Sequence, residues 1–298
     1  NLYFHIGYPR TGTTFLQKYI FPQYSDEAIV DLDLTWFFVN ENKNNKQKLF
    51  SYIDDYFKGR KYEDKPIINS WENLSGDVLR DFQDVPCRIY DMFPESKILI
   101  CLRSQFTMIP SLYHIYVKEG GNFPYRKYID ALLENDKLNY YNIVKDYINY
   151  FGRDSVYVMF YEEMKRNTEL FLKGLINFIG LPEKWDLSVE KKYRNTRNSL
   201  ISIELYRNFN IIKSSYFGGG TVGKAGSAAK ICEKLSRDIF SIIISIFNKG
   251  SIITGLDRKM SMEKKSKYRK RIKSHYSSSN RQLMKVINFD AIELGYPM

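Results

Sequence analysis

Short apolar runs recur along the first 180 residues, and most are followed by a stretch with helical spacing. The apolar runs lie at residues 2–6, 29–34, 66–70, 97–102 and 155–160. Helical patterns follow at residues 15–21, 40–57, 110–117 and 168–179. Strands that alternate with helices in this way predict an α/β fold, in which helices flank a central parallel sheet.

The last third of the chain has a different pattern. Helical spacing at residues 202–212, 228–248 and 279–286 surrounds a Gly- and Ser-rich stretch at 214–227, for which we expect a flexible loop. The chain shows no internal repeat and no second self-contained core. We therefore expect a single domain over residues 1–298, with an α/β core at 1–182 and a helical, loop-rich part at 183–298.

The composition is that of an ordinary globular protein. The 298 residues are 44% hydrophobic and 27% charged, which allows a buried core and excludes disordered, collagen-like and disulfide-scaffold classes. The three Cys and three His residues are scattered without the spacing of metal ligands, so we expect no metal site. The longest strongly apolar stretch, residues 239–247, is far shorter than the ~20 residues that span a bilayer.

The residue usage and the start of the sequence bear on the cellular compartment of the protein. Frequent Lys, Asn, Ile and Tyr are typical of a genome rich in A and T, from which we expect a cytoplasmic protein. No signal peptide is visible in the sequence. The chain begins without Met almost inside its first strand, however. A trimmed N-terminus, and with it a secreted or membrane-anchored origin, therefore stays open.

Basic residues outnumber acidic ones, 45 to 34, which gives a formal net charge of +11. The excess is uneven, since residues 257–275 hold nine basic and two acidic residues. Such a balance favours anionic partners, whether phosphate, sulfate, an acidic glycan, nucleic acid or a membrane surface. The alternative for this stretch is a solvated Lys-rich face.

The segment GYPRTGTT at residues 7–14 carries the clearest chemical signal. Gly7 and Gly12 have the spacing of a phosphate-binding loop, between a predicted strand and a predicted helix, where backbone N–H groups can surround an anion. In nucleotide triphosphatases Lys follows the second Gly, but Thr13 stands here and the cation is Arg10. The loop thus suits an anion without the metal-assisted chemistry of ATPases.

This loop resembles the 5′-phosphosulfate loop of sulfotransferases that use 3′-phosphoadenosine 5′-phosphosulfate (PAPS). Three further segments extend the resemblance in the family's order over nearly the whole chain. Arg103 follows a buried strand, with Ser111 eight residues later. Tyr161 opens a Tyr-Glu-Glu segment after another strand. The pair Asn280-Arg281 and the sequence LGYP at 294–297 form an ending common in bacterial members.

The resemblance implies a P-loop-like fold and a set of nucleotide-binding residues. Arg103 and Ser111 would bind the 3′-phosphate, and Tyr161 would contact the adenine. Phe15 would stack on the adenine, the alternative being a ring in the core. Arg10, where Lys is commoner in the family, would stabilise charge on the leaving phosphate rather than donate a proton. The whole set is Arg10, Thr11, Gly12, Thr13, Thr14, Phe15, Arg103, Ser111, Tyr161, Arg194 and Arg197, the last two by a loose match to further polar contacts.

The catalytic base has two candidate regions. Many cytosolic sulfotransferases use a His about sixty residues after the loop cation, but here Glu72 stands 62 residues after Arg10. Asp31 and Asp33 lie nearer the region from which heparan-type and tyrosylprotein sulfotransferases supply a Glu. Glu72 would take the proton from the acceptor hydroxyl, and its structural alternative is a cap on the following turn.

We therefore expect a sulfotransferase that uses PAPS, releases 3′-phosphoadenosine 5′-phosphate (PAP), and sulfates a hydroxyl acceptor such as a glycan or an anionic polymer. A nucleotide or small-molecule kinase is the first alternative, since the loop topology is shared. A non-catalytic polyanion-binding module, with steep salt dependence, is the second. We expect no nucleic-acid partner and make no prediction of the oligomeric state.

Overall fold

The computed structural model describes residues 1–30, 34, 38, 45–58, 65–71, 84–188, 200–217 and 254–298. The chain forms two compact units. Unit 1 comprises residues 1–108, 135–194 and 273–298, and unit 2 comprises residues 109–134 and 195–272. The expected single domain, with its division near residue 182, stays a prediction.

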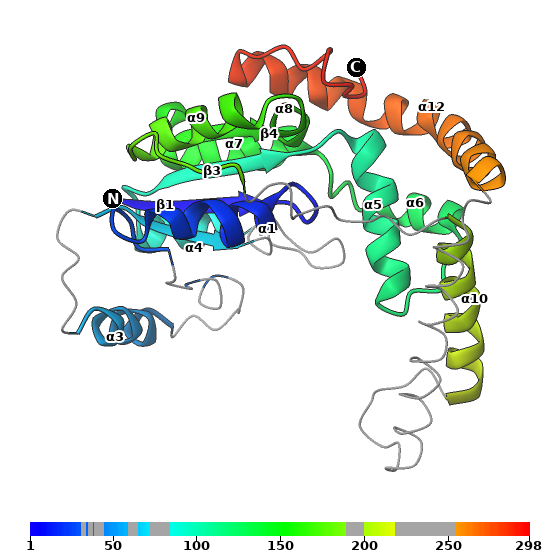
Figure 1. The fold of residues 1–298 in the computed structure, drawn as a ribbon, viewed down its shortest axis with the longest axis horizontal. Helices are drawn as coiled ribbons and strands as arrows, with labels where there is room; N and C mark the ends of the chain where they lie inside the picture. Colours follow the sequence, from blue (N-terminus) through cyan, green and yellow to red (C-terminus); the bar gives the residue numbers. More distant parts are fainter. Residues whose placement is uncertain are drawn as a thin grey trace. The chain divides into compact units, whose positions relative to one another are not determined.

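Four parallel strands form the sheet at the centre of unit 1 (Figure 1). They are β1 (Leu2–Gly7), β2 (Ile67–Trp71), β3 (Lys97–Leu102) and β4 (Val156–Phe160), in the order β2-β1-β3-β4. The α/β prediction is confirmed. Of the remaining predicted strand, Ile29 forms only an isolated bridge to Ile67, and residues 31–33 lie outside the described residues.

Apolar residues cover both faces of this sheet, because the side chains of a strand alternate between its faces. Leu99 and Cys101 of β3 belong to a core cluster that includes residues of η1 (Leu16–Ile20) and α9 (Thr168–Ile179), whereas Ile98 and Ile100 point to the other face and are equally buried. Helix α7 (Tyr140–Phe151) packs against β3, β4 and α4 (Val85–Met92). Two short helical segments, α1 (Thr13–Phe15) and η2 (Phe21–Tyr24), flank η1 along the chain.

The strand order predicts a ligand site between β1 and β3. These two strands are neighbours, but the chain leaves β1 toward β2 and leaves β3 toward β4. In open parallel sheets, ligands bind beyond the carboxyl ends of the strands at such a switch point. The loop after Gly7 and the turn after Leu102 lie at this place.

Unit 2 is helical and is held by aromatic rings. It contains α6 (Tyr125–Glu134) and α10 (Leu200–Phe217), together with parts of α5 (Gln105–Lys118) and α12 (Thr254–Ile287). The ring of Tyr113 lies 4.9 Å from that of Tyr125, and Tyr125 lies 5.4 Å from Tyr268. The buried Asn210 amide donates to the carbonyl of Val117 at 2.7 Å.

Several helices differ from the sequence-based expectations. Helix α10 continues to Phe217, so residues 214–217 are helical and only 218–227 of the expected loop lie outside the described residues. Helix α12 extends well beyond the predicted 279–286. The helix predicted at 40–57 is described as α3 (Asn45–Phe57), and 228–248 lies outside the described residues. The expectations did not include α4, α6 and α7.

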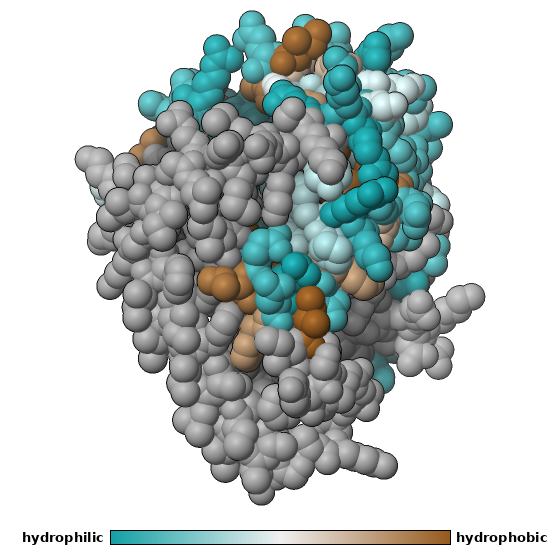
Figure 2. Space-filling model, turned by 90° about the vertical axis from the view of Figure 1, so that its right-hand side faces the viewer, coloured by the Kyte–Doolittle hydropathy of each residue, from teal (hydrophilic) through white to brown (hydrophobic). Residues whose placement is uncertain are grey.

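On the face shown in Figure 2, hydrophobic residues form small, separate areas among hydrophilic ones. Within the described ranges, every helix is too short or too polar to reach across a bilayer.

Candidate functional site

The loop after β1 has the backbone shape of an anion-binding turn. Arg10 and Gly12 both adopt left-handed conformations, with φ of 72° and 94°. Between them, Thr11 is fully buried and its hydroxyl donates to the carbonyl of Tyr8 at 2.6 Å. Backbone N–H groups in such alternating turns, followed by a helix start, form concave sites for anions.

Two glycines allow this loop to close tightly. A Cβ atom on Gly12 would lie 2.6 Å from Cε of Met164, and its positive φ disfavours any other residue. A Cβ atom on Gly7 would overlap the hydroxyl of Thr13. The Gly spacing seen in the sequence therefore has a steric cause at both ends of the loop.

Arg103 joins the turn after β3 to this loop. Its side chain is almost fully buried, at 2% exposure. Nη1 donates to the carbonyl of Arg10 at 2.9 Å and Nε donates to the hydroxyl of Thr107 at 3.0 Å. The cation after β3 and the loop after β1 are thus parts of one site.

Tyr161 lies beside Arg103 because their strands end in register. Leu102 is paired with Phe160, so the residues that follow leave β3 and β4 side by side. The guanidinium of Arg103 lies 4.7 Å from the centroid of the Tyr161 ring, within the range of a cation–π interaction. Tyr161 begins the short helix α8 (Tyr161–Arg166).

Glu162 is a partly buried carboxylate that fixes the turn after Arg103. It accepts a hydrogen bond from the backbone N–H of Ser104 at 3.0 Å and another from the hydroxyl of Thr107 at 3.4 Å. Burial raises the pKa of Glu162, while these hydrogen bonds and the charge of Arg103 oppose the rise. Glu162 therefore lies within the electrostatic surroundings of Arg103.

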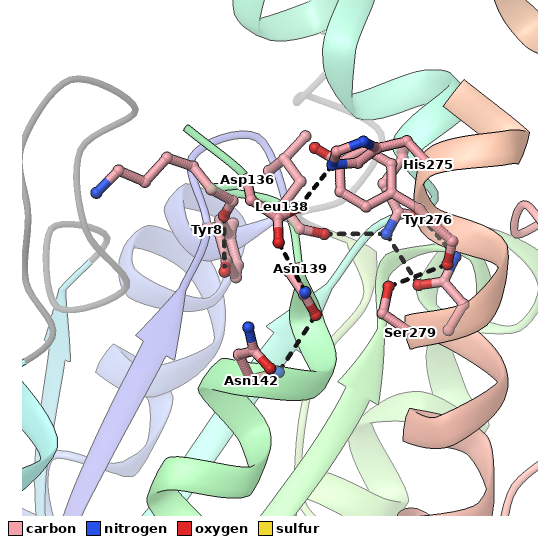
Figure 3. A network of polar contacts seen from close by, with 11 residues as sticks. Tyr8, Asp136, Leu138, Asn139, Asn142, His275, Tyr276 and Ser279 are labelled. Carbon is pink, nitrogen blue, oxygen red and sulfur yellow. Dashed lines mark hydrogen bonds and ion pairs between the residues drawn. The ribbon is translucent and has the colours of Figure 1, made fainter. Parts of the chain in front are cut away.

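A second polar network supports the loop from the side of Tyr8 (Figure 3). The Tyr8 hydroxyl donates to the carbonyl of Lys137 at 3.4 Å, and its ring lies 5.1 Å from that of Tyr140. Next to Lys137, Asp136 pairs with Nε2 of His275 at 2.8 Å. The start of the loop is thereby attached to the turn before α7 and to α12.

The carboxyl end of β2 lies beside the same loop. Trp71 is paired with Ile6, the residue before Gly7, and its side chain is 40% exposed. The buried His5 ring forms a 2.7 Å hydrogen bond with the Ser70 hydroxyl through Nδ1, and burial lowers the pKa of His5 to about 4. These contacts hold the strand end from which the chain continues to Glu72.

The structure brings together part of the predicted nucleotide set. Arg10, Gly12 and Thr14 are half-buried in the loop, Thr11 and Thr13 are buried, and Arg103 and Tyr161 adjoin it. Phe15 lies in the core cluster at 5% exposure, 6.3 Å from the Tyr19 ring. Its contact with adenine stays a prediction.

The positions of the other predicted residues relative to this site stay predictions. Ser111 is half-buried on α5 in unit 2, whereas Arg103 belongs to unit 1, so their pairing on one phosphate stays a prediction. The remaining candidates, Glu72, Asp31, Asp33, Arg194 and Arg197, lie outside the described residues.

Sequence reasoning did not assign roles to Glu162 and Thr107. The sequence did offer one signal for each, because Thr107 follows Arg103 by four residues at a helix start and Glu162 directly follows Tyr161. That the ends of β3 and β4 lie side by side, which brings these residues together, is known only from the strand pairing in the structure.

Comparison with known proteins agrees with the family resemblance. A family model of the sulfotransferase domain matches residues 3–224. Among solved structures, the chain is similar to a sulfotransferase from Alicyclobacillus acidocaldarius, with 21% identity, 76% of this chain and 97% of that chain covered, and a TM-score of 0.48. It is also similar to mouse sulfotransferase SULT7A1 complexed with PAP, with 15% identity, coverage of 70% and 66%, and a TM-score of 0.38. No curated protein matches the chain.

The family model covers well over half of the chain and carries the assignment. Its range includes the loop after β1, Arg103 and Tyr161, which the fold places at one end of the sheet. The chain belongs to the sulfotransferase family.

Proposed function

We propose that the chain transfers a sulfuryl group from PAPS to a hydroxyl of a carbohydrate acceptor. Membership of the sulfotransferase family supports PAPS as the donor. When bound, PAPS supplies the activated sulfuryl group and leaves as PAP. Both the family and Thr13, which stands at the position of the Lys of nucleotide triphosphatases, favour sulfuryl transfer over phosphoryl transfer.

The residues of the site fit an anionic nucleotide. The loop contains two left-handed residues, Arg10 and Gly12, and a glycine at its start, a shape that suits close approach of an anion. Two arginines, Arg10 and Arg103, lie in or beside it. Arginine always carries its charge and binds phosphate groups through several N–H donors.

The proposal assigns separate roles to the predicted nucleotide-binding residues. Arg10 and the loop amides would neutralise the charge that develops on the leaving phosphate. Thr14, half-buried at the second position of α1, would add a hydroxyl donor. Arg103, with Ser111, would bind the 3′-phosphate, and Tyr161 would contact the adenine. Arg194 and Arg197 remain candidates for further contacts to the phosphate or the acceptor.

The base is proposed to be Glu72, with Asp31 or Asp33 as alternatives. A carboxylate that accepts the hydroxyl proton makes the acceptor oxygen a better nucleophile as it attacks. The position of Glu72 directly after Trp71, at the end of the strand next to the loop, supports this choice.

A carbohydrate acceptor is supported by the residues near the loop. The exposed Trp71 offers a flat apolar face and an N–H donor, which suit a sugar ring. The net charge of +11 also suits acidic glycans.

The hydrogen bond between Arg103 Nη1 and the Arg10 carbonyl carries the proposal, because it joins the two predicted phosphate sites. The test is thermal unfolding with PAP, with AMP, and with ATP plus Mg²⁺. We expect the largest stabilisation with PAP, since a ligand that binds only the native state raises stability by mass action. Greater stabilisation by ATP plus Mg²⁺ would overturn PAPS as the donor.

Arg103→Ala is the matched variant in this test. We expect it to weaken PAP binding by roughly 1.5–3 kcal/mol, the range for hydrogen bonds to a charged group, and to reduce the preference for PAP over AMP. Arg103→Lys retains the charge without the fork of N–H donors and should be intermediate. Unchanged discrimination in both variants would remove Arg103 from the 3′-phosphate site.

A further inference from the structure

The residues that follow α12 return to the nucleotide site and are packed there. We name residues 291–298 the C-terminal segment. Ala291 and Tyr296 are buried, at 0% and 4% exposure, whereas Ile292 is 64% exposed. Gly295 adopts a left-handed conformation with φ of 75°, which turns the segment so that Tyr296 points inward.

Buried hydrogen bonds connect this segment to the two residues after Arg103. The hydroxyl of Ser104 donates to the carbonyl of Gly295 at 2.7 Å. Asn280 of α12 donates to the carbonyl of Pro297 at 2.9 Å and accepts from Nε2 of Gln105 at 2.9 Å. The side chains of Ser104, Gln105 and Asn280 are at most 1% exposed. Removing a partner would leave a buried polar group unsatisfied, so these bonds constrain the turn strongly.

Tyr296 connects the segment to the groups that hold Arg103 itself. Its hydroxyl donates to Oε2 of Glu162 at 3.4 Å, and Oε1 of Glu162 accepts from the Ser104 N–H. Its ring also lies 6.5 Å from that of Tyr140. The Tyr140 hydroxyl in turn donates to the carbonyl of Arg103 at 2.7 Å. Tyr296 of the C-terminal segment therefore contacts two side chains, Glu162 and Tyr140, that bond to the peptide group between Arg103 and Ser104. Glu162 binds its N–H and Tyr140 binds its carbonyl.

We propose that the C-terminal segment is a positioning element for recognition of the donor's 3′-phosphate. Through Ser104, Glu162 and Tyr140, it fixes the backbone that presents the Arg103 side chain. Ser104 and Tyr296 are positioning residues in this scheme, because they act through Arg103. The inference rests on the proposed function, in which Arg103 binds the 3′-phosphate.

The experiment measures dissociation constants for PAP and for AMP by isothermal titration calorimetry. The variants are Ser104→Ala and Tyr296→Phe, each of which removes one hydroxyl and keeps the rest of the side chain. Ile292→Ala, at the exposed position of the same segment, is the matched control. Thermal unfolding without nucleotide establishes that each variant is folded.

We expect both variants to bind PAP about threefold to tenfold more weakly, as for the loss of one ordinary hydrogen bond, and AMP nearly as well as the parent. The ratio of the two constants should therefore fall, while Ile292→Ala keeps the parent's ratio. An unchanged ratio in folded variants, or an equal loss of PAP and AMP binding, would overturn the inference. A parent that itself shows no preference for PAP would overturn the proposed function, and this inference with it.

Discussion

Arg103 is held in place by the protein before any nucleotide binds. Its side chain donates to Arg10 and Thr107, and its guanidinium lies against the Tyr161 ring. A long flexible side chain loses much conformational freedom when it is fixed, and here that loss accompanies folding. An arginine positioned in advance binds its anion with a smaller entropic cost, which favours affinity.

The proposed base is best tested by Glu72→Gln, which preserves size and much of the hydrogen bonding. General-base catalysis typically contributes ~10²–10⁴-fold, so turnover should fall at least about a hundredfold while the affinity for PAP stays near that of the parent. Steady-state kinetics and calorimetry measure the two quantities. Asp31→Asn and Asp33→Asn are the matched controls and should have smaller effects. Near-normal turnover of Glu72→Gln would move the base to one of these aspartates.

His5 makes the stability of unit 1 depend on pH. Burial lowers its folded pKa to about 4, below the unfolded value of 6.5, so the unfolded chain binds more protons between these values. The contribution of neutral His5 is fully present above about pH 6.5 and is lost as the pH falls. The resulting loss in free energy of unfolding should amount to roughly 3 kcal/mol by pH 4. Urea unfolding at several pH values should show this loss in the parent.

His5→Gln is the comparison for that prediction, because an amide can still bond to Ser70 but does not titrate in this range. The parent should therefore lose more stability than the variant as the pH falls from about 6.5 to 4, so that the free energy of unfolding of the parent minus that of the variant decreases. Buried groups with raised pKa values, such as Glu162, titrate in both proteins and cancel in the difference. Parallel pH profiles would contradict the assignment to His5.

At the scale of elements, the site depends on strand register. Gly7 is paired with Cys101 and Leu102 with Phe160, so the loop after β1, Arg103 and Tyr161 leave three adjacent strands at the same end of the sheet. The Cys101 thiol also donates to the carbonyl of Thr11, which ties the loop to β3. A shift of one strand by one residue would move its side chains to the opposite face and separate these groups.

The loop after β1 should be less stable with a side chain at position 12. Gly12→Ala should destabilise the protein by about 1–2 kcal/mol, because left-handed backbone is unfavourable for a residue with a Cβ atom. It should also weaken PAP binding, since a residue with a Cβ atom disfavours the left-handed turn that orients the N–H groups of the loop. Gly120→Ala is the matched control, because Gly120 has a similar φ of 104° and nothing within 4 Å of an added Cβ atom. Equal PAP affinities of the two variants would contradict a binding role for the Gly12 turn.

The sequence predicted the elements whose signal is local. The runs that become β1, β3 and β4 are nearly continuous apolar segments, as expected of strands covered on both faces. Helices α6 and α7 were not predicted, although their buried residues do recur with helical spacing, at 128, 129, 132 and 133 in α6 and at 140, 144, 147 and 151 in α7. The role of Glu162 escaped because its partner Ser104 lies 58 residues away, and the sequence does not give the sheet order that joins them.

At the scale of the whole molecule, the net charge of +11 bears on the acceptor. A basic protein attracts acidic polymers over distances that salt shortens, from a Debye length of about 10 Å at 0.1 M to about 3 Å at 1 M. KM for a polysaccharide that contains uronic acids should therefore rise with NaCl concentration. KM for a neutral oligosaccharide should stay nearly constant in the same assay. Equal salt dependence of the two would argue against an acidic glycan as the acceptor.

The bond between Ser104 and Gly295 also has a consequence for biosynthesis. The two partners are 191 residues apart, and a ribosome adds about 5–20 residues per second, so the second is made roughly ten to forty seconds after the first. Once residue 160 has been added, and until residue 291 is reached, a nascent chain contains every strand of the described sheet but none of the C-terminal segment. The hydroxyl of Ser104 must then bond to water or a chaperone, and all strands of the sheet are synthesised before the segment whose contacts complete the proposed nucleotide site.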